Sequence, residues 1–166
     1  MKNYDDLPAD YWSRKLIESG RTLACAESCT GGGLSARITD VPGISAVFQG
    51  GVIAYENQVK SRVLQVSSQV LEQQGAVSKP VAEAMALGVQ ALLATDFALS
   101  TTGIAGPGGG SVEKPVGLVW MAVAGPQGVR SEKQIFSGNR EQIRAQAIEH
   151  SLQMLYAALI QSDSES

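Results

Sequence analysis

A chain of 166 residues is long enough to bury an apolar core and short enough to form one domain. Its hydrophobic residues make up 44% and its charged residues 17%, a balance that excludes an intrinsically disordered protein. The net charge is −3 and no run of lysine or arginine occurs, so we expect no binding to nucleic acid.

The chain carries no pattern of a secreted, membrane or zinc protein. Its first twelve residues lack the basic start and apolar run of a secretory signal. The longest apolar run, Val116–Gly125, is about half of a membrane span. We therefore expect a cytoplasmic protein without membrane contact. Cys25, Cys29 and His150 are too few for a structural zinc site, so we expect reduced cysteines, no metal and no cofactor.

Helices and strands are predicted to alternate in the first part of the chain, from the spacing of apolar residues and the position of capping residues. In chain order we predict a helix over Pro8–Ser19, a strand over Thr22–Ala26, a helix over Thr30–Thr39, an extended segment over Ser45–Tyr55, a helix capped by Asn57 through Leu64, a helix capped by Ser68 through Gln74, and a long helix over Val81–Ala94.

The remainder is predicted to consist of three strands, a glycine-rich loop and a final helix. We predict strands over Asp96–Thr101, Val116–Ala124 and Glu132–Phe136, a loop over Thr102–Gly110, a link over Gly125–Ser131, a helix capped by Asn139, and a polar, frayed tail over Gln161–Ser166.

This order is typical of an α/β domain. Continuous apolar strands separated by helices indicate a sheet that is covered on both faces. The short link over Gly125–Ser131 favours an antiparallel hairpin, so the sheet should contain both strand directions. We predict a single-domain layered sandwich over residues 1–160, in which a mixed, mostly buried sheet is flanked by helices.

Ser28 is the candidate nucleophile. It lies in the sequence AESCTGGG, which begins at Ala26 and joins a buried strand to a glycine-rich helix start. Backbone amides of Thr30, Gly31 and Gly32 could receive an oxyanion there, because a helix N-terminus favours negative charge. The alternative is that Ser28 and Thr30 only cap the helix.

A serine nucleophile needs a base, and Lys60 is the candidate. His150 falls in an amphipathic helix and is interpreted as a surface or satisfied residue. A lysine can act instead when desolvation lowers its pKa. Tyr55 ends the preceding strand, so its phenol and the Lys60 amine could point into one cleft. The alternative is a surface lysine beside a half-buried tyrosine.

The predicted loop TGIAGPGGG, which begins at Thr102, is the third candidate segment. Consecutive backbone amides, including those of Gly103, Gly106, Gly108 and Gly109, could form an anion-binding concavity. The loop lacks the Gly-Lys-Ser/Thr ending of a nucleoside-triphosphate loop. The alternative is a flexible surface loop.

Together these segments resemble the C-terminal domain family of the competence-damage protein CinA, and within it the stand-alone bacterial nicotinamide mononucleotide amidohydrolases. Small departures are Gly33, which extends the usual Gly-Gly pair, and FSGNR in place of the commoner FSGDR. The similar motifs are AESCTGGG at Ala26, DVPGISAVFQGGVIAYENQVK at Asp40, GAVS at Gly75, TGIAGPGGG at Thr102, EKPVG at Glu113 and FSGNR at Phe136.

The resemblance implies a function and a set of roles. It implies hydrolysis of nicotinamide mononucleotide to nicotinate mononucleotide and ammonia, without metal, in pyridine nucleotide recycling. It implies that Ser28 acts with Lys60 and Tyr55, and that the Thr102 loop lies at the active site. Arg140 is a candidate phosphate partner, because guanidinium groups suit phosphate oxygens. The alternative is a nucleotide-binding or regulatory module of this fold without catalysis. A homo-oligomer is left open.

Overall fold

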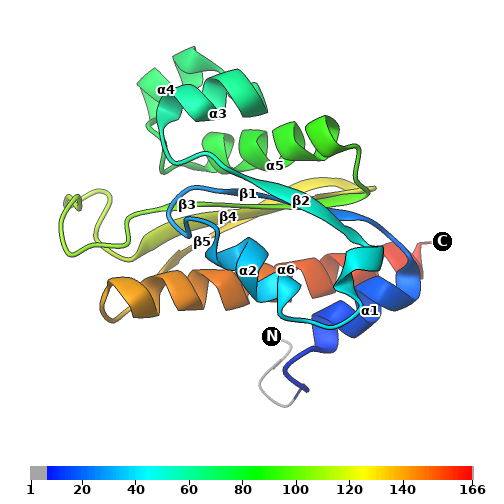
Figure 1. The fold of residues 1–166 in the computed structure, drawn as a ribbon. Coiled ribbons are helices and arrows are strands. Elements are labelled where there is room, and N and C mark those ends of the chain that lie inside the picture. Colours follow the sequence, from blue (N-terminus) through cyan, green and yellow to red (C-terminus); the bar gives the residue numbers. More distant parts are fainter. Residues whose placement is uncertain (1–6, 166) are drawn as a thin grey trace.

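The protein is described by a computed structural model over residues 7–165 (Figure 1). Residues 1–6 and 166 lie outside this range. They belong to the first twelve residues, for which no secretory signal is predicted, and to the predicted polar tail. Within it, five strands form one sheet in the order β2–β1–β3–β4–β5. The strands are β1 (Leu23–Glu27), β2 (Phe48–Ile53), β3 (Phe97–Gly103), β4 (Leu118–Gly125) and β5 (Gly128–Ile135).

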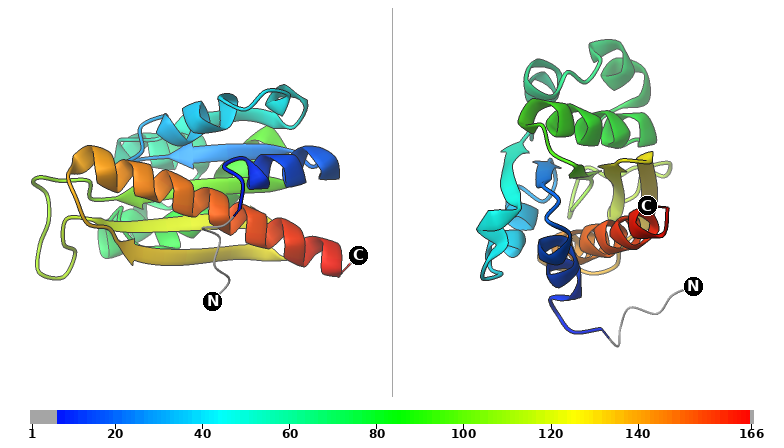
Figure 2. Two further views of the ribbon diagram at one scale, coloured as in Figure 1. Left: turned by 90° about the horizontal axis from the view of Figure 1, so that it is seen from below. Right: turned by 90° about the vertical axis from the view of Figure 1, so that its right-hand side faces the viewer.

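The sheet is mixed, as predicted. Strand β1 pairs in parallel with both β2 and β3, whereas β3–β4 and β4–β5 are antiparallel pairs. Helices cover both faces (Figure 2). One face carries α1 (Tyr11–Ser19), α2 (Gly33–Thr39) and α6 (Arg140–Ser164); the other carries α3 (Asn57–Leu64), α4 (Ser68–Gln74) and α5 (Lys79–Leu93).

Two apolar layers hold the sandwich together. Along β1, Leu23 and Cys25 pack in the layer with α1, α2 and α6, while Ala24 and Ala26 pack in the layer with α3, α4 and α5. Successive strand residues face opposite sides of a sheet, which explains this alternation. The small residues on the second side let α5 lie close to the sheet. In the described range, no helix has the length and apolar character to cross a bilayer.

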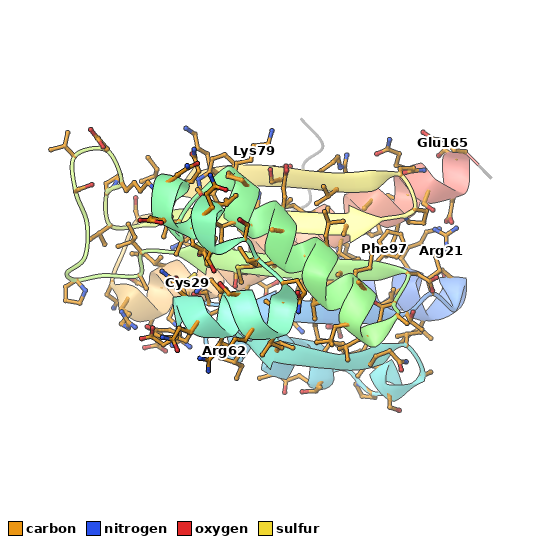
Figure 3. All side chains as sticks on the ribbon, turned by 90° about the horizontal axis from the view of Figure 1, so that it is seen from above. Arg21, Cys29, Arg62, Lys79, Phe97 and Glu165 are labelled. Atoms are coloured by element: carbon orange, nitrogen blue, oxygen red, sulfur yellow. The ribbon has the colours of Figure 1, made fainter. Side chains whose placement is uncertain are left out.

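The carboxyl ends of β1, β2 and β3 meet at one edge of the sheet, at the left of Figure 1. The N-terminus of α6 and the loop after β3 reach the same edge. Figure 3 places Cys29, just after β1, at this end and Phe97, the first residue of β3, at the other. Open α/β sheets bind ligands at such carboxyl edges, so we expect a functional site at this edge.

Helix α3, which carries Lys60, is held against α5 at Gly88. A Cβ added to Gly88 would overlap the carbonyl oxygen of Leu64 at the end of α3. We expect Gly88→Ala to destabilise the protein by roughly 1–3 kcal/mol through overpacking, although alanine alone is favoured in helices by about 1 kcal/mol. Urea unfolding measures the change.

The matched control for Gly88 is Ala91→Gly, at an exposed position of the same helix. It should cost about 1 kcal/mol, from helix propensity alone. A Gly88→Ala variant as stable as the parent protein would contradict the close approach of α3 and α5.

Two predicted caps are wrong by one residue. Asn57 is the first residue of α3 and Glu56 precedes it in extended conformation. Ser68 is likewise inside α4, and Ser67 is the cap, since its hydroxyl accepts a hydrogen bond from the Val70 amide at 3.3 Å. Adjacent polar residues offer equivalent caps to a sequence pattern, and only the backbone conformation decides between them.

The predicted ends of β3 and α6 are also corrected. Thr102 and Gly103 belong to β3 instead of the loop, because they pair with Trp120 and Val119 of β4. Helix α6 continues to Ser164, so most of the predicted frayed tail is helical. The hairpin between β4 and β5 is tighter than predicted, since β5 begins at Gly128.

The start of α6 is confirmed. The Asn139 side chain accepts a hydrogen bond from the Gln142 amide at 2.9 Å, and the Gln142 side chain accepts one from the Asn139 amide at 2.8 Å. This reciprocal capping box fixes where α6 begins at the sheet edge.

Candidate active site

Ser28 and Lys60 meet at the carboxyl edge of the sheet. Ser28 follows β1 directly, and its amide donates to the carbonyl of Thr101 in β3 at 2.9 Å. Lys60 reaches the same point from α3, and its Nζ lies 2.9 Å from the Ser28 Oγ. The Lys60 side chain is fully buried and Ser28 is 9% exposed. The two candidates from the sequence are therefore in direct contact.

The Lys60 amine has no anionic partner in the described chain. Its Nζ also donates to the carbonyl oxygens of Ala54 at 2.8 Å and Tyr55 at 2.9 Å. Burial lowers the pKa of Lys60 and outweighs the opposing effects of Cys29 and Glu56. A neutral amine has two hydrogens and one lone pair, so it can donate to both carbonyls and accept the proton of the Ser28 hydroxyl. The contacts suit a base.

Glu27, the last residue of β1, is a buried carboxylate beside the nucleophile. One oxygen accepts from the Thr30 hydroxyl at 2.6 Å and the Leu34 amide at 2.7 Å. The other accepts from the Ser35 amide at 3.0 Å and the Ser35 hydroxyl at 2.7 Å. Glu27 therefore caps the N-terminus of α2, where the helix dipole favours an anion.

Arg144 of α6 holds the loop after Ser28 by donating hydrogen bonds to two backbone carbonyls of that loop. Its Nε donates to the Cys29 oxygen at 3.1 Å and its Nη2 to the Thr30 oxygen at 2.8 Å. The carbonyl and the following N–H of a trans peptide point in opposite directions, so binding of the Cys29 carbonyl turns the Thr30 amide away from Arg144. Thr30 itself is fully buried, and in residues 7–165 its amide has no acceptor.

The predicted oxyanion donors differ in their availability. The Gly31 amide already donates to the Ser28 carbonyl at 3.1 Å. The amides of Thr30 and Gly32 have no acceptor among the described residues. Gly31 and Gly32 have φ angles of 57° and 98°, which side-chain-bearing residues rarely adopt, and this explains the glycines. Thr30 and Gly32 are therefore better oxyanion candidates than Gly31.

The Tyr55 phenol does not join the Ser28–Lys60 pair. Tyr55 binds Lys60 through its backbone carbonyl, while its side chain is 57% exposed. The hydroxyl accepts from Arg140 Nη2 at 3.1 Å, and Arg140 Nη1 donates to the Gly106 carbonyl at 2.7 Å. Arg140 thus bridges Tyr55 and the glycine loop. The direct Lys60–Ser28 contact leaves no need for a relay through the phenol.

The glycine-rich segment contributes in part. The Thr102 hydroxyl points to the α5 side, where it donates to the Ala76 carbonyl at 2.9 Å, and a Cβ on Gly103 would press against β4. Both are parts of the sheet rather than of an anion loop. Gly106 contacts Arg140, whereas Gly108 and Gly109 are exposed and have amides with no acceptor in the described range.

Three residues near Ser28 were absent from the predicted site. Glu27 and Arg144 are described above, and the Thr101 hydroxyl lies 2.7 Å from that of Thr30. Two had a signal in the sequence: Glu27 is a charge in an otherwise apolar strand, and Arg144 follows Arg140 by one helical turn. Thr101 had none, because its role depends on the pairing of β3 with β1.

Cys29 is a poor alternative nucleophile. It is 6% exposed, and burial raises its pKa to about 12, so the reactive thiolate is scarce at neutral pH. Both cysteines are free, as predicted. No group of three or more metal-ligating His, Cys, Asp or Glu side chains occurs in the described residues.

The fold and site together define an α/β sandwich with a buried serine–lysine pair where parallel strands end. The family model described as the CinA C-terminal domain matches residues 7–159. The chain belongs to the CinA C-terminal domain family, which confirms the resemblance inferred from the motifs.

Curated relatives and solved structures point to the same family. A CinA-like protein of Parasynechococcus marenigrum (strain WH8102) is 54% identical over 136 residues, which cover 82% of this chain and 32% of that protein. One from Desulfotalea psychrophila is 47% identical over 159 residues, covering 95% and 38%. The competence/damage inducible protein CihA from Agrobacterium tumefaciens has a TM-score of 0.85 at 38% identity, covering 96% of this chain and 99% of that one. The chain spans about a third of the length of these curated relatives.

Proposed function

We propose that the protein hydrolyses the carboxamide of nicotinamide mononucleotide to give nicotinate mononucleotide and ammonia, with Ser28 as nucleophile and Lys60 as base. The observation that carries the proposal is the 2.9 Å contact between the Ser28 hydroxyl and a buried lysine amine without an anionic partner in the described chain. The substrate comes from the resemblance of the motifs to the amidohydrolases, since many ligands fit a serine–lysine site.

The geometry supports acyl transfer in two steps. Neutral Lys60 takes the Ser28 proton as Oγ attacks the amide carbon, and free backbone amides, including that of Thr30, bind the resulting oxyanion. When the tetrahedral intermediate collapses, the C–N bond breaks. The Lys60 ammonium gives its proton to the leaving nitrogen, which departs as ammonia. Water then attacks the acyl-serine with Lys60 again as base, and the acid is released while Ser28 regains its proton.

Arg140 is the proposed partner of the substrate phosphate. Its guanidinium contacts two neutral oxygens, of Tyr55 and Gly106, and forms no ion pair within residues 7–165. An unneutralised guanidinium at an exposed position beside the site suits a phosphate monoester.

We expect Arg140→Gln to raise KM for nicotinamide mononucleotide roughly 10- to 100-fold with little change in kcat, since a charged hydrogen bond contributes about 1.5–3 kcal/mol. Nicotinamide riboside, which lacks the phosphate, is the control substrate, and its kcat/KM should change by less than about threefold. An equal loss on both substrates would contradict the phosphate contact. Steady-state ammonia release measures all four reactions.

The deciding experiment for the function is ammonia release from nicotinamide mononucleotide, with nicotinamide and nicotinamide riboside as comparison substrates and a Ser28→Ala preparation as the blank. Release that depends on Ser28 supports the amidohydrolase. Binding of the nucleotide without release would instead favour the alternative, a nucleotide-binding or regulatory module in which Ser28 only precedes a helix.

A further inference from the structure

Glu27 is a buried charge for which the proposed reaction has no use. Its carboxylate is 0% exposed, and no lysine, arginine or histidine lies within ion-pair distance among residues 7–165. A buried carboxylate is costly unless hydrogen bonds compensate it, and Glu27 receives four from neutral donors. A helix cap alone does not require such a residue, because serine or threonine serves that purpose at the surface.

The four donors come from two different parts of the chain. The Leu34 and Ser35 groups belong to α2, whereas the Thr30 hydroxyl belongs to the loop that follows Ser28. Since the single Thr30 hydroxyl proton is donated to Glu27, the nearby Thr101 hydroxyl donates to Thr30. The hydrogen bonds thus run from β3 through Thr30 to Glu27 and on to α2.

This chain of bonds determines where the Thr30 peptide lies. Arg144 holds the Thr30 carbonyl from the α6 side, and Glu27 holds the Thr30 side chain from the interior of the sandwich. With both ends of the residue fixed, the amide that has no acceptor in the described structure keeps one direction. Donors that are already oriented stabilise an oxyanion without reorganisation.

We infer that Glu27 is a positioning residue: acting through the Thr30 hydroxyl, it holds the loop after Ser28 so that the Thr30 amide can bind the oxyanion of the transition state. This inference rests on the proposed function for the reaction that it assists. It assigns Glu27 no contact with the substrate and no transfer of a proton.

Two variants each remove one of the hydroxyl groups that donate a hydrogen bond to the Glu27 carboxylate. Thr30→Val removes the 2.6 Å hydrogen bond from the loop after Ser28 to Glu27, together with the 2.7 Å contact to Thr101, and Ser35→Ala removes the 2.7 Å hydrogen bond from α2 to Glu27. Both leave the Glu27 charge and the backbone donors in place. We expect Thr30→Val to lower kcat roughly 10- to 100-fold with KM changed by less than about threefold, because a displaced oxyanion donor acts only in the transition state. Ser35→Ala should stay within about threefold of the parent protein in both constants.

A second readout does not depend on the substrate. Ser28 should react with a fluorophosphonate probe, and the labelling rate should fall in Thr30→Val by a factor similar to that in kcat, while Ser35→Ala labels at the parental rate. Equal effects of the two variants, or a change confined to KM or to the melting temperature, would overturn the inference and leave Glu27 as a helix cap.

The outcomes also separate this inference from the proposed function. Labelling of Ser28 without ammonia release would reject the proposed substrate, and the labelling rates of the two variants would still decide the role of Glu27. Ammonia release that depends on Ser28, with Thr30→Val and Ser35→Ala alike, would reject only the role of Glu27. Absence of both labelling and release would reject the two together.

Discussion

Ser28→Ala is expected to lower kcat on nicotinamide mononucleotide by roughly 10³-fold or more, because the variant has no atom that can form the acyl-enzyme. Binding should persist, since the proposed phosphate contact through Arg140 and the free loop amides remain. Calorimetric titration with the nucleotide should give a Kd within about threefold of the parent value. The small, nearly buried serine leaves little space on removal, so the melting temperature should change little.

Cys29→Ala is the matched control for Ser28→Ala. Cys29 is the neighbouring residue and is slightly more buried than Ser28, but its raised pKa argues against a role as nucleophile. We expect kcat within about threefold of the parent enzyme. If Ser28→Ala remained active and Cys29→Ala were inactive, the assignment of the nucleophile would be reversed.

Lys60→Met is expected to lower kcat roughly 10²- to 10⁴-fold, the usual contribution of a general base. Methionine fills much of the same space without an amine. The control is Lys114→Met, which removes another lysine whose amine donates to a backbone carbonyl, that of Gln74 at 2.7 Å. Lys114 has no contact with Ser28, so activity should be retained. Loss of activity in both variants would indicate a general need for positive charge in place of a base.

The lowered pKa of Lys60 also sets the sign of the pH dependence. Only the neutral amine accepts a proton, so kcat/KM should fall as the pH drops below the pKa of Lys60 and rise above it. Because burial lowers that pKa, the midpoint of the rise should lie below the ordinary lysine value of 10.5. A profile that declines as the pH rises toward 10 in a folded protein would contradict the role of Lys60 as base.

Much of the fold could be predicted because its determinants are local. The apolar runs that became β1 and β4, and the Asn139 capping box, are visible within a few residues. The boundary after Thr101 could not be predicted in the same way. Glycine suggests a loop, yet Gly103 belongs to β3 because it pairs with Val119 of β4. The position is a glycine because β4 lies so close that it leaves no room for a side chain.

The candidate site could likewise be predicted only in part from the sequence. Ser28 and Lys60 could be proposed because a nucleophile needs a base and few residues in this chain could supply one. That the two touch is a property of the fold, since β1 and α3 bring them together. The roles of Thr101 and Arg144 depend entirely on which strands and helices pack at the sheet edge. The sequence predicts that the Tyr55 phenol shares a cleft with the Lys60 amine, and in the structure it is the Tyr55 carbonyl that contacts this amine.

The Lys60 amine is held by carbonyl oxygens of Ala54 and Tyr55, which belong to the main chain and are present whatever side chains occupy those positions. Mutation at either residue therefore leaves both acceptors in the molecule. The phenol of Tyr55, which contacts Arg140, can be replaced without removing the carbonyl that orients the base. A substitution that alters the contact with Arg140 thus need not disturb the Ser28–Lys60 pair.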